Sequence, residues 1–479
     1  MLTAAAARRL RPAVDVRDAA LCGLLALLVY VLLGQRTFYK IDGHLYLALV
    51  LDGERSYPRH FLYLPMVHAA RDLLAPLGLT LYEAARLLSA LGTATGMALL
   101  HLASRGLGLE RRAALLATAT CATMPHVVFF ATVVEVHGPF LAFSGLAAVA
   151  AAALTRRPSV GRAATFGATC ALAFCAHSTA ALLPALLLPL ILLYPPRPFA
   201  RGLLPGAVTA ATLAAGIALS PFVARLVGVE FDLHHSGAFA TDRATTNFGA
   251  AWRYGHTLLY EWLIPMLPLS VLTPCGLLGR RLRAQTGWLL LGAIIYLACA
   301  LMILGGEAEW GAYLLPFCWP LALWALRALP VRGVLLVLAL QAGTAVWLVR
   351  RHDDPRRTLA YAQGARELAD GAPLALLAGD DIDLQAYLLH LTDAERLPLF
   401  ELARLPATAV ADAGAALRHR IDDLLARGCA VLLSDAARAR VVAVPAATPC
   451  GSGLLALLER SYRCTPAARE GFTGTRLFR

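Results

Sequence analysis

The chain has 479 residues, of which 58% are hydrophobic and only 15% are charged, and its mean hydropathy is +0.63. Soluble domains carry roughly a quarter charged residues, so this composition excludes an ordinary soluble domain and predicts an integral membrane protein. The formal net charge of +12 would suggest nucleic-acid binding in a soluble chain. Here the arginines fall in short loops between apolar runs, so membrane topology explains them better.

The apolar runs predict an α-helical polytopic membrane protein with about eleven spans, because a helix needs about 20 apolar residues to cross hydrocarbon. The expected spans are 19–35, 82–104, 113–131, 138–154, 163–177, 178–194, 203–223, 257–277, 286–305, 312–328 and 332–349. The basic segment before the first span has no convincing cleavage site, which favours an uncleaved span over a signal peptide.

The distribution of arginine predicts the orientation of the spans. Every second short loop is basic, as at Arg105, Arg111 and Arg112, whereas the short loops near 132–137, 177 and 305–311 contain no Lys or Arg. The positive-inside rule then places the N-terminus in the cytoplasm and the tail after residue 350 outside it. This alternation requires a break between two short spans at His177.

The predicted outer loops collect the side chains that can do chemistry. The first outer loop (36–81) holds Asp42, His44, Arg59 and His60, and the second holds Glu135 and His137. The third is the break at His177, the fourth holds His234, His235 and Arg253, and the fifth holds Glu307 and Glu309. Ionisable groups at membrane depth are costly and usually functional. We therefore expect the functional site on the outer face of the membrane.

Each of these residues also has a simpler interpretation. Asp42 in "FYKIDGHLYL" is either a helix cap or a catalytic base. Glu135 and His137 in "FFATVVEVHGPF" either line a shared pocket or are polar groups at the interface. His177 is either a histidine at a helix break or an anion ligand. His234 and His235 are poor joint metal ligands, because adjacent residues of an extended segment face opposite ways.

The tail (351–479) predicts a small α/β domain outside the cytoplasm. "PLALLAGDD" at 373–381 and "CAVLLSD" at 429–435 are typical of buried strands followed by acidic turns, and "DAGAALRHRIDDLLARG" predicts an amphipathic helix that ends at Gly428. Asp380, Asp381 and Asp383 are interpreted as helix caps in preference to ligands. Cys450 and Cys464 are able to pair if the tail is extracytoplasmic.

Several classes of site are absent from the sequence. There is no P-loop, GxGxxG, HExxH or CxxC motif, which argues against an ATP-driven pump, a metalloprotease and a structural zinc site. A carboxylate beside cationic donors instead suits transfer of a group from a lipid phosphate. Such a reaction needs a base for the acceptor hydroxyl and donors for the departing phosphate. The sequence is compatible with a divalent metal and with a metal-free mechanism. No cofactor is the preferred expectation, since Arg and His are able to take the place of a divalent metal.

Four stretches, in this order, resemble the GT-C superfamily of membrane glycosyltransferases, nearest its bacterial protein O-mannosyltransferase-like branch. "KIDGHLYLALV" followed by "HFLYLPMVHAARDLL" resembles the first outer loop, with an acidic residue and an amphipathic surface segment. "TVVEVHGPFLAFSGLAAVAAAAL" resembles the acidic motif before the fourth span, "CALAFCAHSTAALLPALLLPL" the break between the fifth and sixth spans, and "GEAEWGAYLLPFCWPLALWAL" the late Leu-Pro-rich span. The pattern covers about 35–350.

The resemblance implies a polyprenyl-phosphate-linked sugar donor, an outer-face active site and inversion at the anomeric carbon. It implies Asp42 as the general base or as a carboxylate that orients the acceptor, and Glu135 as a second carboxylate near the donor or the acceptor. The implied substrate or phosphate contacts are His44, Arg59, His60, His137, His177, Arg253 and Glu307. The chain departs from the branch in lacking its His-Pro-Pro-Gly-like turn and in having His137 where tyrosine is common.

The expected function is therefore transfer of a sugar to a protein, lipid or glycan hydroxyl by a multi-pass protein of the bacterial inner membrane. The domains expected are 1–350 and 351–479. A transporter or lipid flippase is the main alternative, because discontinuous helices also build transport sites. A non-catalytic relative whose tail binds a partner is the third. The chain has no internal repeat between halves, which favours the enzyme over the transporter.

Overall fold

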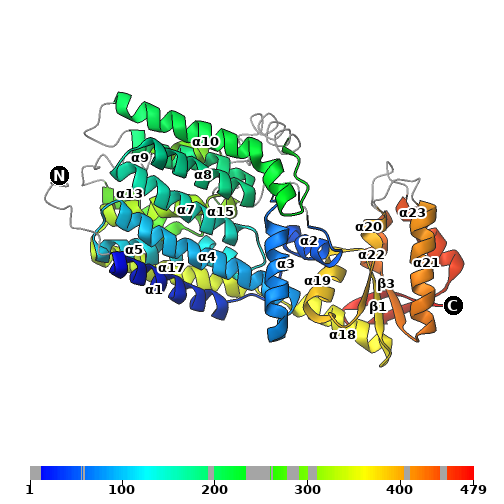
Figure 1. The fold of residues 1–479 in the computed structure, drawn as a ribbon. Coiled ribbons are helices and arrows are strands. Elements are labelled where there is room, and N and C mark those ends of the chain that lie inside the picture. The colour runs from blue at the N-terminus through cyan, green and yellow to red at the C-terminus, as the bar shows by residue number, and fades with distance from the viewer. Residues whose placement is uncertain are drawn as a thin grey trace. The chain divides into compact units, whose positions relative to one another are not determined.

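A computed structural model of the chain describes residues 12–55, 57, 60–192, 199–233, 259, 263–277, 291–299, 310–403, 410–442 and 450–479. These residues form two compact units (Figure 1). The first unit takes in residues up to Gln35 and then Leu49–His352. The second takes in Arg36–Ala48 and Asp353–Arg479, so a short segment near the N-terminus groups with the C-terminal part of the chain.

The first unit is helical. Its helices are α1 (Pro12–Leu32), the end of α2 (Lys40–Leu51), α3 (Tyr63–Leu74), α4 (Leu81–Gly106), α5 (Arg111–Ala122), α6 (Pro125–Thr132), α7 (His137–Arg156), α8 (Val160–Ala176), α9 (Leu183–Leu192), α10 (Phe199–Leu226), α13 (Leu267–Leu277), α15 (Trp310–Tyr313), α16 (Cys318–Ala328) and α17 (Val331–His352). Short 3₁₀ turns at Ala75–Leu77, Ser178–Leu182 and Leu315–Phe317 join or extend them. Successive contacts link α1, α4, α7, α8 and α10 in that order across the unit (Figure 1).

The length and composition of the helices support a membrane protein. Among the described residues, four helical stretches are long and apolar enough to cross a membrane, and the bent pair α5 and α6 would make five. The expected count of eleven spans stays a prediction.

Two expectations about helix breaks have different outcomes. The break at His177 is confirmed, because α8 ends at Ala176 and His177 is extended before the 3₁₀ turn begins. The span expected over 113–131 is not one straight helix, since α5 and α6 meet at a bend of 61°, and its count as a single span stays a prediction. Pro125 begins α6, and a proline lacks the backbone N–H that would continue α5.

Helix α4 illustrates how sequence sets these boundaries. The Thr80 hydroxyl accepts from the Glu83 N–H at 3.2 Å, and the Glu83 carboxylate accepts from the Thr80 N–H at 2.8 Å. This capping box satisfies donors that a helix start otherwise leaves without partners. The helix then runs for 26 residues, or about 39 Å at 1.5 Å per residue, which is enough to cross hydrocarbon.

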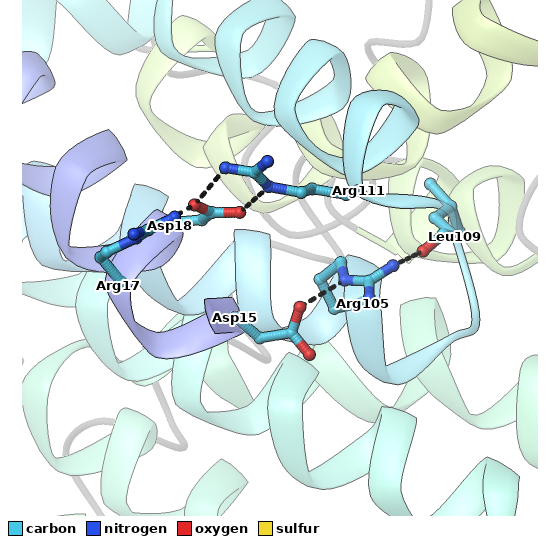
Figure 2. Close-up of polar contacts among 6 residues, drawn as sticks. All are labelled: Asp15, Arg17, Asp18, Arg105, Leu109 and Arg111. Atoms are coloured by element: carbon cyan, nitrogen blue, oxygen red, sulfur yellow. Dashed lines mark hydrogen bonds and ion pairs between the residues drawn. The ribbon is translucent and has the colours of Figure 1, made fainter. Parts of the chain in front are cut away.

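Two ion pairs tie α1 to its neighbours α4 and α5 (Figure 2). Asp15 accepts from Arg105 Nε at 2.7 Å, and Asp18 accepts from two nitrogens of Arg111. Asp15 and Asp18 are 4% and 2% exposed, so both carboxylates depend on these guanidinium groups for compensation of their charge. Arg105 also donates to the Leu109 carbonyl oxygen, which holds the turn between α4 and α5.

Arg105→Ala is expected to lower the free energy of unfolding by about 3 kcal/mol, because it leaves the buried Asp15 carboxylate without its cation. The measurement is the melting midpoint of the detergent-solubilised protein. Arg71→Ala is the matched control, since Arg71 and Asp72 form a pair whose side chains are 37% and 67% exposed. Equal midpoints for the two variants would contradict the structural role of the Asp15 pair.

The second unit is a three-layer α/β domain. Its elements after Asp353 are α18 (Arg356–Ala369), β1 (Leu374–Ala378), α19 (Asp381–His390), β2 (Glu395–Pro398), α20 (Leu399–Ala403), α21 (Val410–Ala426), β3 (Ala430–Ser434), α22 (Asp435–Val442), α23 (Cys450–Ser461), β4 (Arg463–Arg469) and β5 (Phe472–Phe478). The strand order is β2-β1-β3-β5-β4, with β1 parallel to β2 and β3, and β5 antiparallel to β3 and β4.

Alternating strand residues divide the core of this unit into two halves. Leu377 and Leu433 pack with residues of α20, α21, α22 and α23, whereas Leu376 and Leu432 pack with residues of α18 and α19 (Figure 1). Strands covered on both faces are largely apolar, as β1 and β3 are up to Ser434 at the end of β3. The predicted strands and the helix ending near Gly428 are confirmed, and Gly428 has the positive φ of 77° expected at a helix end.

Among the acidic residues after β1, Asp383 holds the turn that leads into α19. The Asp383 carboxylate accepts from the Gly379 and Asp380 N–H groups at 3.0 Å and from the Ser434 hydroxyl at 2.8 Å. It therefore closes the turn into α19, as the capping interpretation predicts. Cys464 is a free thiol in this unit, and the side chain of Cys450 lies outside the described residues.

Candidate active site

Hydrogen bonds between its backbone and Ser89 hold Glu135 just before the start of α7. Its N–H donates to the Ser89 hydroxyl at 3.1 Å, and that hydroxyl donates to the Glu135 carbonyl oxygen at 2.9 Å. Ser89 lies on α4, so one side chain pins the acidic residue to the neighbouring helix. The Val136 N–H also reaches the Glu135 carboxylate at 3.3 Å. Glu135 is 2% exposed, which places its charge inside the helical unit.

Small residues allow α4 and α7 to approach closely at this point. A Cβ on Gly92 would lie 2.5 Å from the Pro139 nitrogen, and a Cβ on Gly138 would overlap with the Ser89 backbone oxygen. Backbone atoms cannot move aside as the end of a flexible side chain does. Glycine is therefore required on both helices for the Ser89 contacts with Glu135 to form.

Gly138→Ala is expected to destabilise the protein by about 2 kcal/mol, because α4 and α7 must separate to admit the methyl group. The melting midpoint in detergent measures this effect. Gly161→Ala in α8 is the matched control, since a Cβ there meets nothing within 4 Å. A Gly138→Ala midpoint as high as that of the control would show that the two helices do not need this close approach.

Three histidines from separate segments lie together near the start of α7. The rings of His60 and His177 stack with centroids 4.2 Å apart, and those of His137 and His177 are 5.0 Å apart. All three are buried, at 8%, 2% and 2% exposed for His60, His137 and His177. Tyr313 packs edge-on against His137, with centroids 5.6 Å apart. The structure thus brings together three histidines that the sequence assigns to different outer loops.

The hydrogen bonds of His177 define which ring nitrogen carries its proton. The Thr179 N–H donates to His177 Nδ1 at 3.2 Å, and the Thr179 hydroxyl lies 2.7 Å from the same atom. An atom that accepts a backbone N–H carries no hydrogen, so the neutral imidazole has its hydrogen on Nε2. His177 is therefore arranged as a hydrogen-bond donor through Nε2 and is poorly suited to act as a base.

Tyr63 is a neighbour of Glu135 that the sequence did not reveal. It lies in α3 and is fully buried. Burial, followed by the charge of Glu135, raises the pKa of the Tyr63 hydroxyl well above its ordinary value. The hydroxyl therefore keeps its proton beside the carboxylate. Ser89 and Thr179 were missed as well, because a hydroxyl residue within a helix or after a histidine has no distinctive sequence signal.

Asp42 and His44 lie at the start of α2, in the part that belongs to the second unit. Asp42 is half-buried in the first turn of the helix. A carboxylate there also interacts favourably with the helix dipole, so its position fits both the cap and the base. His44 is 2% exposed, and its Nε2 lies 3.3 Å from the Asp381 carboxylate of α19.

The remaining predicted site residues lie outside the described residues. These are Arg59, His234, His235, Arg253, Glu307 and Glu309. Within the part of the chain that the structure describes, no group of three or more His, Cys, Asp or Glu side chains is arranged to hold a metal ion.

Comparison with solved structures identifies the fold, whereas comparison of sequences does not. No protein-family profile matches the chain, and no curated protein matches it in sequence. ArnT from Cupriavidus metallidurans bound to undecaprenyl phosphate matches with a TM-score of 0.57 and 15% identity, over 96% of this chain and 97% of that one. Apo ArnT matches over the same shares of the two chains, with a TM-score of 0.54 and 15% identity. The chain therefore has, over nearly its whole length, the fold of ArnT.

Proposed function

We propose that the chain is a membrane glycosyltransferase that moves a sugar from a polyprenyl-phosphate donor to an acceptor hydroxyl, with inversion at the anomeric carbon. The observation that carries this proposal is the likeness to ArnT along 96% of the chain, because that structure holds undecaprenyl phosphate. The buried carboxylate and histidines at the start of α7 add groups suited to such a donor.

The proposed reaction needs one base and one set of donors. Asp42 takes the proton from the acceptor hydroxyl as the acceptor oxygen bonds to the anomeric carbon. The bond between that carbon and the phosphate oxygen breaks with its electron pair, and polyprenyl phosphate leaves. Negative charge therefore accumulates on the phosphate in the transition state, and hydrogen-bond donors aimed at it accelerate the reaction.

Two features of the helical unit are suited to the departing phosphate. His177 offers Nε2–H as a donor because Thr179 occupies its other nitrogen. His137 is the first residue of the 20-residue helix α7, where the helix dipole favours an anion. Its Nδ1 is buried and has no hydrogen-bond partner among the described residues, so it remains available to a bound molecule. Glu135 serves as the second carboxylate beside these groups.

The finer features of the proposal come from the sequence motifs. The mannosyltransferase-like branch makes mannose the first sugar to test, with a protein, lipid or glycan hydroxyl as acceptor. Arg59, His60, Arg253 and Glu307 are proposed as further substrate contacts. The proposed location is the bacterial inner membrane, with the N-terminus in the cytoplasm and 351–479 outside it. The first outer loop (36–81) supplies the catalytic residue of the 1–350 domain.

The test is a transfer assay with the purified full-length protein. A panel of undecaprenyl-phosphate sugars is supplied, and release of undecaprenyl phosphate is measured with and without candidate acceptors. Turnover of at least one donor is expected. If no donor is turned over, and Asp42→Asn and Glu135→Gln behave as wild type in cells, the transferase proposal fails.

A transporter or flippase is the second candidate, because the helices are interrupted at His177 and between α5 and α6. Reconstituted vesicles distinguish the two functions. A transporter moves labelled undecaprenyl-phosphate sugar between leaflets without breaking its sugar–phosphate bond. The transferase cleaves that bond.

A further inference from the structure

The segment Arg36–Ala48 is attached to the α/β unit by polar contacts at both ends. The Arg36 N–H donates to the Asp353 carboxylate, and His44 Nε2 lies 3.3 Å from Asp381 Oδ1. The Gln385 side-chain nitrogen lies 3.4 Å from His44 Nδ1, and Phe38 packs edge-on against the imidazole with centroids 5.7 Å apart. We call His44, Asp381 and Gln385 the His44 clasp.

The clasp lies where α/β sheets usually bind ligands. Asp381 begins α19 directly after β1, and the chain reaches β2 on one side of β1 and β3 on the other. Such a topological switch point forms a crevice beyond the carboxyl ends of the strands. Here the Asp381 side chain faces His44 from the protein's own segment 36–48. The segment therefore contacts the α/β unit just beyond the carboxyl end of β1.

The two hydrogen bonds of the clasp define the roles of the His44 ring nitrogens. The Gln385 amide donates to Nδ1, so Nε2 carries a hydrogen and donates it to Asp381. The hydrogen bond from His44 lowers the pKa of Asp381, burial opposes this shift, and the charges of His44 and Arg440 add to it. Asp381 is therefore ionised at neutral pH and is a strong acceptor for His44.

The clasp also determines which way Asp42 points. Residues two apart on an α-helix are separated by about 200° around its axis. His44 faces α19, so Asp42 is directed to the other side of α2. Any rotation of α2 that released His44 would turn the Asp42 carboxylate by the same angle.

We propose that Asp381 and Gln385 are positioning residues, which hold His44 and thereby orient the Asp42 carboxylate for the transfer reaction. This assigns the α/β unit a role in catalysis, although none of its residues after Asp353 needs to touch the substrate. The proposal rests on the proposed transferase function for its catalytic part. Its structural part, the docking of segment 36–48, can be tested by itself.

The test uses the purified full-length protein and two variants in α19 and its following turn. Asp381→Asn removes the charge that His44 bonds. Asp393→Asn is the matched control, because Asp393 is 70% exposed and pairs with Arg366 at the surface of the same unit. Hydrogen–deuterium exchange is measured for peptides covering 36–48 and, separately, for peptides covering α19.

Asp381→Asn is expected to speed exchange in 43–48 about tenfold, with α19 itself unchanged. Release of undecaprenyl phosphate from its sugar conjugate is expected to lose about tenfold in kcat with little change in KM, since the clasp orients the base and does not bind the donor. The double variant with His44→Asn is expected to lose no more than Asp381→Asn alone, because both changes break one interaction.

Three results would overturn the proposal. Unchanged exchange in 43–48 would show that the clasp does not hold the segment. Faster exchange with unchanged kcat would show that docking does not orient Asp42. A loss of kcat in the double variant equal to the product of the losses in the two single variants would show that His44 and Asp381 act separately. If the wild type turns over no donor, the proposed transferase function fails, and the exchange measurement alone then decides whether the clasp exists.

Discussion

Asp42→Asn is expected to lower kcat for sugar transfer by about 1,000-fold while the protein stays folded. The amide has the shape of the carboxylate but cannot accept a proton from the acceptor hydroxyl. The same change separates the two interpretations of Asp42, because loss of its charge beside the helix dipole costs only about 1 kcal/mol of stability and leaves the reaction unaffected. A residue that only stabilised the start of α2 would tolerate it.

The measurement is single-turnover transfer by purified protein, with the melting midpoint as a check on folding. Asp52→Asn is the matched control, since Asp52 is exposed just after the end of α2. Activity of Asp42→Asn near that of Asp52→Asn would assign Asp42 to helix stabilisation and leave the reaction without its proposed base.

Glu135→Gln is expected to lower kcat/KM by about 100-fold. The change removes a buried charge without removing the contacts that place the residue, because Ser89 bonds the Glu135 backbone and not its carboxylate. The Val136 N–H is still able to donate to the amide oxygen. The expected loss is therefore chemical and not structural.

Binding of undecaprenyl phosphate by native mass spectrometry, measured beside kcat/KM, shows whether the loss lies in donor binding or in the reaction. Glu54→Gln is the control, as Glu54 is an exposed carboxylate of the first outer loop. A Glu135→Gln variant as active as Glu54→Gln would mean that the buried carboxylate serves only the packing of α7 on α4.

Periodicity and apolar runs predicted the parts of the fold that depend on local signals. The buried strands β1 and β3 and the Gly428 helix end agree with the structure. The β4–β5 hairpin was not predicted, although Gly471 has the positive φ of 78° that its two-residue turn requires. Its strands have mostly exposed side chains in β4, so the pattern of buried residues is weak.

The candidate site was only partly predictable for a different reason. Glu135, His137 and His177 stand out because charged and polar residues are rare in apolar stretches. Their neighbours Ser89 and Tyr63 do not, because a serine within α4 and a tyrosine in α3 resemble ordinary packing residues. The Asp381 contact with His44 joins positions 337 residues apart, and a single sequence contains no signal for such a pairing.

That separation has a consequence for the order in which the protein is made. Chains are synthesised at roughly 5–20 residues per second, so His44 emerges some tens of seconds before Asp381 exists. Throughout this interval the start of α2 lacks the partner that orients it. Completion of the α/β unit would then be the step that switches on the catalytic loop, so that a nascent or C-terminally truncated chain remains inactive in the membrane.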